Sequence, residues 1–223
     1  MKVIDTVIFD MDGVLIDSEG FWRQAEKETL NALGVKWDEK TANELKGQTI
    51  TGVIEFWYNR TPWEGSTITQ VENAITNRVL ELIAEKGVIN PGVKDTLEYL
   101  QQNNYKIGLA SNSSAHMINT VIELLGIKSY FQTIVSSDFV KEGKPAPDVY
   151  LLAAKNLESN SENCLVIEDS FTGATAGKRA NMIVIAVPEH DEFNSNKFDF
   201  VDYKLKSLEH FVATLNKIQQ VKN

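Results

Sequence analysis

The sequence predicts an α/β protein with a doubly wound parallel sheet and a helical segment inserted early in the chain. Short apolar runs rich in β-branched residues indicate buried strands, and they lie at 3–9, 107–110, 134–135, 165–167 and 183–187. After residue 90 these runs alternate with helical patterns, which is typical of a parallel sheet covered by helices on both faces. Between residues 17 and 88 the pattern is helical throughout, so we expect an inserted α-helical cap.

The expected domain organisation follows from this change of pattern. Residues 1–16 and 89–223 form the α/β core, and residues 17–88 form the helical cap. Ser18 or Asp17 is expected to cap the first cap helix, and further helices are expected to begin near positions 38, 51 and 69.

All four tryptophans lie in the predicted cap, at positions 22, 37, 57 and 63. Large aromatic side chains in such a helical block are typical of a small hydrophobic core, so we expect them to fill the cap interior. Trp63 is the exception, because the neighbouring Pro62 and Gly65 mark a loop. We expect Trp63 to reach a ligand or a neighbouring surface.

Composition excludes several classes of partner. The chain has 223 residues and a formal net charge of −9, whereas nucleic acids and anionic membranes require clustered Lys and Arg. No apolar run approaches the length of about 18 residues that a membrane span needs. Three His and one Cys offer little material for a zinc site, so oxygen ligands and Mg²⁺ are the better expectation. We expect a cytoplasmic monomer that acts on a small molecule.

Two aspartates, Asp10 and Asp12, stand one residue apart at the end of the first apolar run. Side chains on a strand alternate between faces, so both carboxyl groups should project to the same side just past the strand's carboxyl end. Carboxylates this close repel each other, unless a divalent cation shares them or their proton affinities are split between nucleophile and acid/base. The alternative is a simple Asx turn, since Asp12-Gly13 is an ordinary turn pair.

Ser111 and Asn112 follow the second strand of the predicted sheet. Hydroxyl groups, an amide and free N–H groups at a helix N-terminus make an anion site, so we expect both residues to contact phosphate. Ser113 or Ser114 should serve as the N-cap of the helix that follows.

Two further strand ends carry charged residues. Lys144 precedes Pro145, which restricts the lysine to an extended backbone on a stiff base, although a solvated surface lysine is the alternative. Glu168 and Asp169 end the next buried strand, where adjacent carboxylates are costly unless a cation neutralises them. Together with the first aspartate pair they indicate an oxygen-rich magnesium site.

In combination these motifs resemble those of the haloacid dehalogenase (HAD) superfamily of phosphatases with a helical cap. The set covers the whole core and comprises Asp10-x-Asp12-Gly13-Val14, Ser111-Asn112, Lys144-Pro145 and Glu168-Asp169-Ser170. The cap segment Trp57-Tyr58-x-Arg60-x-Pro62-Trp63-x-Gly65 is similar to the hexitol phosphatase, or 2-deoxyglucose-6-phosphate phosphatase, branch. The resemblance implies a HAD-like, Rossmann-type core and hydrolysis of sugar or hexitol phosphates, such as 2-deoxyglucose 6-phosphate and sorbitol 6-phosphate.

The resemblance also implies a role for each motif. Asp10 attacks phosphorus to form an aspartyl-phosphate, and Asp12 protonates the departing sugar oxygen and later accepts a proton from water. Mg²⁺ is held by the Asp10 carboxylate, the Asp12 main-chain carbonyl and Asp169, with Glu168 nearby or bound through water. The phosphoryl oxygens are bound by Ser111, Asn112 and Lys144.

The cap is implied to close over the sugar and to select the substrate. The residues expected to face the sugar are Glu19, Lys46, Gln48, Thr49 and Trp63. Polar contacts of this kind reject wrong hydroxyl patterns better than apolar fit does.

Two alternatives stay open. A β-phosphoglucomutase has a similar core and cap, but Trp22 stands here where such mutases place an acid/base histidine, and the position of their arginine for the distal phosphate falls near Ile50. Lys46 is then the only obvious candidate for a second anion clamp. A non-catalytic phospho-acceptor domain also uses a strand-end aspartate, but it leaves Asp12 and the cap unexplained.

Overall fold

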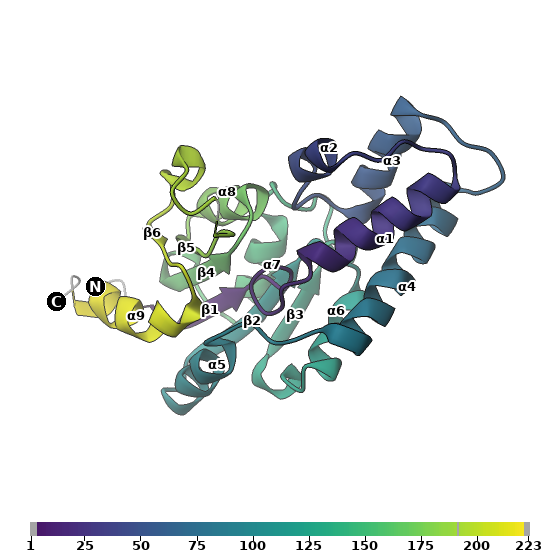
Figure 1. Ribbon diagram of the computed structural model, residues 1–223. Coiled ribbons are helices and arrows are strands. Elements are labelled where there is room, and N and C mark those ends of the chain that lie inside the picture. The colour runs from purple at the N-terminus through teal and green to yellow at the C-terminus, as the bar shows by residue number, and fades with distance from the viewer. Residues whose placement is uncertain (1–3, 191, 221–223) are drawn as a thin grey trace.

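The computed structural model describes residues 4–190 and 192–220, and its centre is a six-stranded sheet. The strands are β1 (Thr6–Phe9), β2 (Lys106–Ser111), β3 (Thr133–Ser136), β4 (Cys164–Glu168), β5 (Ile183–Ala186) and β6 (Tyr203–Lys204). They run parallel in the order β3-β2-β1-β4-β5-β6. β1 therefore lies at the switch point of a doubly wound sheet, and the predicted fold class is confirmed (Figure 1).

Among the described strands, β6 alone was not predicted from the sequence. It contains two residues, which is too short for a recognisable alternation of apolar and polar side chains. It pairs with β5 at the edge of the sheet, through Ile185↔Tyr203 and Ala186↔Lys204. The other strands overlap the predicted apolar runs and differ from them only at their ends.

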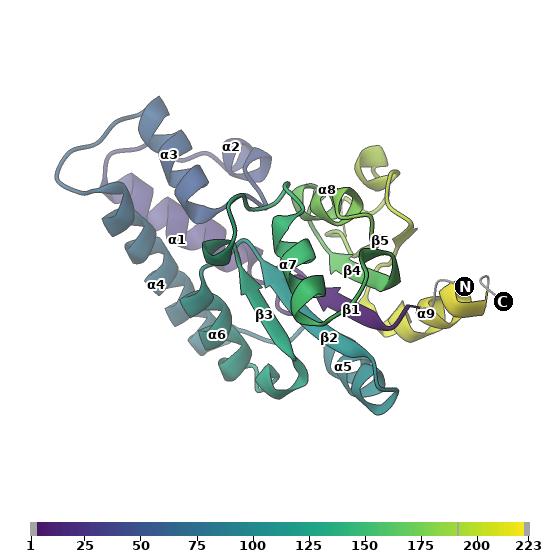
Figure 2. The ribbon, with the colours of Figure 1, turned by 180° about the vertical axis from the view of Figure 1, so that it is seen from behind.

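Helices cover both faces of the sheet, because successive side chains of each strand point to opposite sides. On one face, Val7 and Phe9 belong to a hydrophobic core shared with α5 (Val93–Gln102), α6 (Ala115–Leu124) and α9 (Phe211–Gln220). On the other face, Ile8 packs in a second core with α7 (Asp148–Asn156) and α8 (Phe171–Arg179). Figure 2, seen from behind, brings α7 to the front of the sheet.

The cap consists of α1 (Glu19–Ala32), α2 (Glu39–Glu44), α3 (Ile50–Arg60) and α4 (Ile68–Lys86). These helices form a lobe beside the sheet (Figure 1), and each begins within one residue of its predicted start. Trp57 is fully buried in the hydrophobic core, together with Leu30, Ile54 and Ile75. Three cap helices start with a side chain that accepts a backbone hydrogen bond, namely Asp38, Thr49 and Thr67.

Two segments of chain connect the cap to the core, and they lie side by side. Ile16 forms an antiparallel bridge with Ile89, and the Asn90 N–H donates to the Leu15 carbonyl. The Asn90 side chain also donates to the Gly13 carbonyl in the loop after β1. This adjacency supports the predicted division at residues 16 and 89, which we retain as a proposal.

Single turns of 3-10 helix connect several of these elements, at Lys128–Tyr130, Ser137–Phe139, Ser161–Asn163, Asn196–Phe198 and Leu208–His210. Within residues 4–190 and 192–220, no helix combines the length and the apolar character needed to cross a membrane.

The close approach of α8 to β4 gives a test of the fold. An added Cβ at Gly173 would lie 1.6 Å from Oε1 of Glu168, whereas one at Gly20, also within a helix, would meet nothing within 4 Å. We expect Gly173→Ala to lower the free energy of unfolding by about 3 kcal/mol, because the buried Glu168 carboxylate has no room to move aside.

Gly20→Ala is the matched control, and it should leave stability unchanged or raise it by up to about 1 kcal/mol. Urea denaturation of both variants measures the difference. Wild-type stability of Gly173→Ala would contradict the packing of α8 against β4.

Candidate active site

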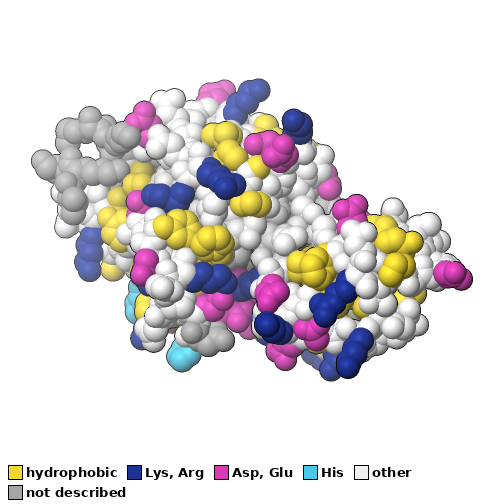
Figure 3. Space-filling model, turned by 90° about the horizontal axis from the view of Figure 1, so that it is seen from above, with side chains coloured by type: hydrophobic (Ala, Val, Ile, Leu, Met, Phe, Trp, Pro, Cys, Tyr) yellow, Lys and Arg dark blue, Asp and Glu magenta, His cyan; other side chains and the backbone are white. Residues whose placement is uncertain are grey.

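A cavity lies where the carboxyl ends of β1, β2 and β4 face the cap. Its core lining includes Asp10, Asp12, Ser111, Asn112, Lys144 and Asp169, and its cap lining includes Glu19, Trp22, Glu26, Lys46 and Gln48. Figure 3 shows acidic and basic side chains gathered where the two lobes meet. The carboxyl edge of a doubly wound sheet is the usual place for a ligand. All core residues predicted for the site except Glu168 are among the described residues that line this cavity. Glu168 is fully buried below them.

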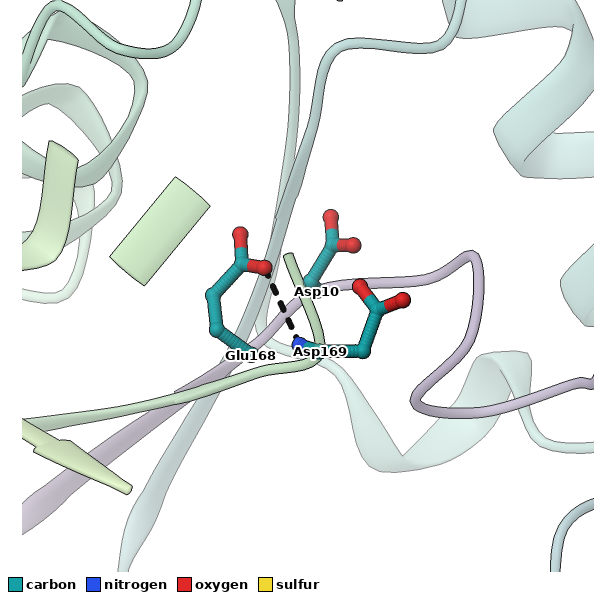
Figure 4. Close-up of side chains that lie close together, drawn as sticks. All are labelled: Asp10, Glu168 and Asp169. Carbon is teal, nitrogen blue, oxygen red and sulfur yellow. Dashed lines mark hydrogen bonds between the residues drawn. The ribbon is translucent and has the colours of Figure 1, made fainter. Parts of the chain in front are cut away.

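Three buried carboxyl groups, those of Asp10, Glu168 and Asp169, converge below this cavity (Figure 4). One oxygen atom of each lies within 4.8 Å of the other two. Asp10 follows β1, whereas Glu168 and Asp169 come at the end of β4, so the parallel pairing of these strands brings the acids to one edge. The Lys144 ammonium binds Asp10 Oδ1 and lies 2.7 Å from Glu168 Oε1. One buried cation thus holds two of the three acids together.

The groups in this cluster shift one another's proton affinity. Burial is the largest cause that raises the pKa of Asp10, Glu168 adds to it, and Lys144 acts in the opposite direction. Burial lowers the pKa of Lys144, but Asp10 and Glu168 more than offset it, so this pKa is raised and the amine stays protonated. Burial also raises the pKa of Asp169 to about 6, against the effect of Lys46. A further cation would relieve the repulsion among these acids.

Glu168 anchors the cluster. Its Oε1 accepts hydrogen bonds from the Lys144 ammonium and, at 2.6 Å, from the Tyr150 hydroxyl. Its Oε2 accepts from the N–H groups of Asp169 and Ser170 and from the Ser170 hydroxyl. Both oxygens are therefore occupied by the protein, and the side chain has no exposed surface. Glu168 is better suited to position Lys144 than to bind a ligand directly.

Asp10 and Asp169 have carboxylate oxygens that are available as ligands for a divalent cation. The buried Asp169 Oδ2 accepts no well-directed hydrogen bond from the described residues, although Lys46 Nζ lies 2.9 Å away. Gly13 makes room beside this oxygen, since its φ is +72° and a Cβ there would come within 2.2 Å of it. Hard carboxylate oxygens of this kind fit a divalent cation.

Asp12 is held by neutral hydrogen-bond donors. Its Oδ1 accepts from the Ser18 hydroxyl and from Trp22 Nε1, and its Oδ2 accepts from the Ser113 hydroxyl, the last two at 2.9 Å. The prediction that Ser18 caps the first helix needs correction. Ser18 occupies the N-cap position of α1 but makes no side-chain capping bond, because its hydroxyl is directed at Asp12. Trp22 and Ser113 were not predicted for the site, and the i, i+4 spacing of Ser18 and Trp22 was the signal that could have found Trp22.

The loop after β2 has residues that stabilise the local structure and residues that line the cavity. Ser114 caps α6 by accepting a hydrogen bond from a backbone N–H in its first turn, as predicted. The Asn112 side chain accepts from the Lys144 N–H and donates to the carbonyls of Lys144 and Gly47. Asn112 thus joins two core loops to the cap. Phosphate contact by Ser111 and Asn112, which both line the cavity, stays a prediction.

Three of the five cap residues predicted to face the substrate line the cavity, namely Glu19, Lys46 and Gln48. The Lys46 ammonium lies 2.9 Å from both Asp169 Oδ2 and Glu189 Oε1, and 3.7 Å from Glu19 Oε1. This lysine therefore crosses from the cap to the core. Burial raises the pKa of Glu19 to about 7, against the effect of Lys46.

The other two, Thr49 and Trp63, lie outside the set of described residues that line the cavity. Thr49 is the N-cap of α3, and its hydroxyl oxygen accepts from the Gly52 N–H at 3.2 Å. Trp63 is 7% exposed, its Nε1 donates to the Ser66 carbonyl, and its ring packs edge-on against Tyr58. The expectation that Trp63 reaches a ligand is therefore corrected, because its loop folds back on α3 and buries the indole.

Glu26 is a cap acid that the sequence analysis did not single out. It lies on α1 one turn beyond Trp22, lines the cavity and is 9% exposed. Burial raises the pKa of Glu26 to about 7, while a hydrogen bond from Trp37 and the charge of Arg23 act in the opposite direction. No sequence signal distinguishes this residue, because a glutamate within a helix is ordinarily a solvated surface residue.

Comparison with known proteins identifies the family. A family model described as haloacid dehalogenase-like hydrolase matches residues 4–181. The chain belongs to this haloacid dehalogenase-like hydrolase family. The resemblance drawn from the motifs is thereby confirmed, and the protein is a hydrolase. Hexitol phosphatase B of Escherichia coli (strain K12) is 36% identical to this hydrolase over 215 residues, which cover 95% of this chain and 96% of that protein.

Solved structures share the architecture of this haloacid dehalogenase-like hydrolase along nearly the whole chain. CbbY from Rhodobacter sphaeroides, in complex with phosphate, matches with a TM-score of 0.86 and 27% identity, covering 96% of this chain and 100% of that one. β-Phosphoglucomutase from Clostridium difficile matches with a TM-score of 0.83 and 26% identity, covering 98% of this chain and 100% of that one. The arrangement of core and cap is thus shared with proteins of related fold.

The burial of Glu26 makes the stability of this hydrolase depend on pH. The folded-state pKa is about 7 and the ordinary value is 4.5. The folded protein therefore binds this proton more tightly than the unfolded chain does, and stability falls as pH rises from about 4.5 through about 7. Relative to wild type, we expect Glu26→Gln to gain about 2.5 kcal/mol between pH 5 and pH 8, because glutamine cannot ionise.

Urea denaturation at the two pH values measures this gain. Glu28→Gln is the control, because Glu28 is an exposed acid on the same helix whose pKa is lowered by hydrogen bonds from Gln24 and Arg78. A stability difference between wild type and Glu26→Gln that did not change with pH would contradict the described burial.

Proposed function

We propose that this protein is a Mg²⁺-dependent phosphomonoesterase that hydrolyses sugar or hexitol phosphates through an aspartyl-phosphate intermediate, and that it acts as a cytoplasmic monomer. The observation that carries the proposal is the contrast between Asp10 and Asp12. Asp10 is bound to a buried lysine inside an acidic cluster, whereas Asp12 is held by neutral donors, and both line one cap-covered cavity. Two carboxyl groups in such different surroundings suit different roles in one reaction.

Asp10 is the proposed nucleophile. Lys144 binds its Oδ1, which leaves Oδ2 as the oxygen that attacks phosphorus in line with the leaving group. The attack forms the bond between Asp10 and phosphorus and breaks the bond from phosphorus to the sugar oxygen. Lys144, Ser111 and Asn112 line the cavity and are the residues that we propose to bind the phosphoryl oxygens.

Asp12 is the proposed acid and base. It donates a proton to the departing sugar oxygen, and in the second step it takes a proton from the water that hydrolyses the aspartyl-phosphate. The donors Ser18, Trp22 and Ser113 fix the direction of its carboxyl group. Since none of these three side chains titrates near neutral pH, the proton exchange is left to Asp12.

The acidic cluster is the proposed cation site. Its ligands are the carboxylates of Asp10 and Asp169 and, by the family resemblance, the main-chain carbonyl of Asp12, while Glu168 holds the set in place. When bound, Mg²⁺ supplies positive charge that offsets the carboxylates and the phosphoryl oxygens during transfer.

A sugar or hexitol phosphate is the proposed substrate, supported by the relative named hexitol phosphatase B and by the polar cap residues that line the cavity. Mutase activity is the second candidate, because the structural neighbours include a β-phosphoglucomutase. Two observations favour hydrolysis. Trp22, whose indole can only donate a hydrogen bond, contacts Asp12, and Lys46 is already paired with Asp169 and Glu189 instead of being available for a second phosphate.

A substrate screen tests the proposal. With Mg²⁺, the purified protein should release phosphate from 2-deoxyglucose 6-phosphate and sorbitol 6-phosphate, and it should convert little β-glucose 1-phosphate to glucose 6-phosphate. Asp10→Asn is the control, and it should lose turnover by about a thousandfold or more, because the carboxylate nucleophile is gone.

Phosphate release by Asp10→Asn at more than about a tenth of the wild-type rate would rule out Asp10 as the nucleophile. Efficient conversion of β-glucose 1-phosphate by the wild type would instead favour the mutase.

The choice of metal is tested separately. Activity on 2-deoxyglucose 6-phosphate should vanish in a chelator, return with Mg²⁺ and fail to return with Ca²⁺, because Ca²⁺ prefers more ligands and a looser geometry. Asp169→Asn should raise the Mg²⁺ concentration needed for half-maximal activity at least about tenfold, since it removes a charged ligand. Full activity in the chelator would remove the metal from the mechanism.

A further inference from the structure

We propose that Glu26 forms a hydroxyl-binding subsite in the cap, where its carboxylate accepts hydrogen bonds from the distal hydroxyl groups of a polyol or sugar phosphate. The inference rests on the proposed phosphatase function and deepens it, because it names a residue that selects the part of the substrate remote from phosphorus. It follows from the position, burial and hydrogen-bond partners of this side chain.

The position of Glu26 follows from the face that α1 presents to the cavity. Glu19, Trp22 and Glu26 recur at helical spacing, and all of them line the cavity. Since Trp22 Nε1 donates to Asp12, this face of α1 borders the reacting centre. Glu26 lies four residues further on, an advance of about 6 Å along the helix axis. That advance is comparable with the length of a six-carbon chain attached to the phosphoester.

Glu26 is nine-tenths buried and incompletely hydrogen-bonded. Trp37 Nε1 donates to its Oε2 at 3.2 Å, while its Oε1 accepts no hydrogen bond from residues 4–190 and 192–220. Arg23, on the same helix, pairs instead with Glu19 and Glu189. A carboxylate withdrawn from water without a cation is costly, and its raised pKa reflects the same cost. Such a cost is typical of functional sites, where a ligand supplies the missing donors.

The surroundings of Glu26 match the chemistry of a polyol. The cavity lining includes apolar side chains such as Leu45, Val53 and Met117, and Thr76 adds a hydroxyl group. A polyol chain presents C–H groups, which suit the apolar wall, and O–H groups, which require acceptors. An ionised carboxylate accepts hydrogen bonds through both oxygens and donates none. Glu26 therefore favours the binding of substrates with hydroxyl groups, and an ester that lacks them gains no hydrogen bond from it.

Steady-state kinetics of Glu26→Gln with two phosphate esters tests the subsite. Sorbitol 6-phosphate carries distal hydroxyl groups, whereas p-nitrophenyl phosphate carries none. At pH 8, above the Glu26 pKa of about 7, we expect the ratio of kcat/KM for sorbitol 6-phosphate to that for p-nitrophenyl phosphate to fall about tenfold, mainly through KM, because a charged acceptor is replaced by a neutral amide. Glu28→Gln on the exposed side of the same helix is the matched control, and it should leave the ratio unchanged.

An unchanged ratio in Glu26→Gln would overturn the inference, since a merely structural carboxylate alters stability without distinguishing the two esters. If Glu26→Gln does not fold, Glu26→Asp gives the same comparison. The aspartate keeps the charge, but its side chain is one methylene group shorter, so the carboxylate lies further from the substrate. Its ratio should fall, and an unchanged ratio would again overturn the subsite. Failure of the wild type to hydrolyse any phosphate ester would instead overturn the proposed function on which the inference rests.

Discussion

The ion pairs of Lys144 are the interaction on which the rest of the site depends. Parallel pairing of β1 with β4 places Asp10 and Glu168 at the same buried edge, where like charges repel. Lys144, itself 6% exposed, bridges the two acids and allows both to remain there. A buried pair that loses one partner costs about 3–5 kcal/mol, because the remaining charge is left uncompensated. The charge of Lys144 also acts against the burial that raises the pKa of Asp10.

The cap completes the surroundings of the acids that the sheet brings together. Trp22 reaches across to Asp12, Lys46 reaches to Asp169, and the carbonyl of Gly47 accepts a hydrogen bond from Asn112. Each of these contacts joins a cap residue to the acidic cluster or to a loop that supports it. The position of the cap therefore determines how the carboxyl groups of Asp12 and Asp169 are held.

The core of the site was predictable because it depends on local pattern. Asp10, Asp12, Lys144 and Asp169 each follow a short apolar run or a stiff turn, and the carboxyl ends of parallel strands all face one edge. Alternation along a strand decides within two residues which way a side chain points. The sequence by itself therefore determined the α/β class, the inserted cap and the meeting of these acids, whereas the ion pairs of Lys144 with Asp10 and Glu168 appear only in the tertiary structure. The sequence did not reveal β6, because a strand of two residues is too short to show an alternation of apolar and polar side chains.

Only the tertiary structure decided where the side chains of the cap point. Trp63 was expected to reach a ligand or a neighbouring surface and is packed inside the cap, whereas Trp22 was expected in the interior and donates to Asp12. Glu26 has the sequence context of a solvated helical glutamate, yet it is buried in the wall of the cavity. A helix can turn any of its faces toward a neighbour, and the choice depends on ridges and grooves contributed by segments far away in the chain. Helical periodicity therefore predicts that a cap helix exists, while the docking of that helix determines which of its residues line the cavity.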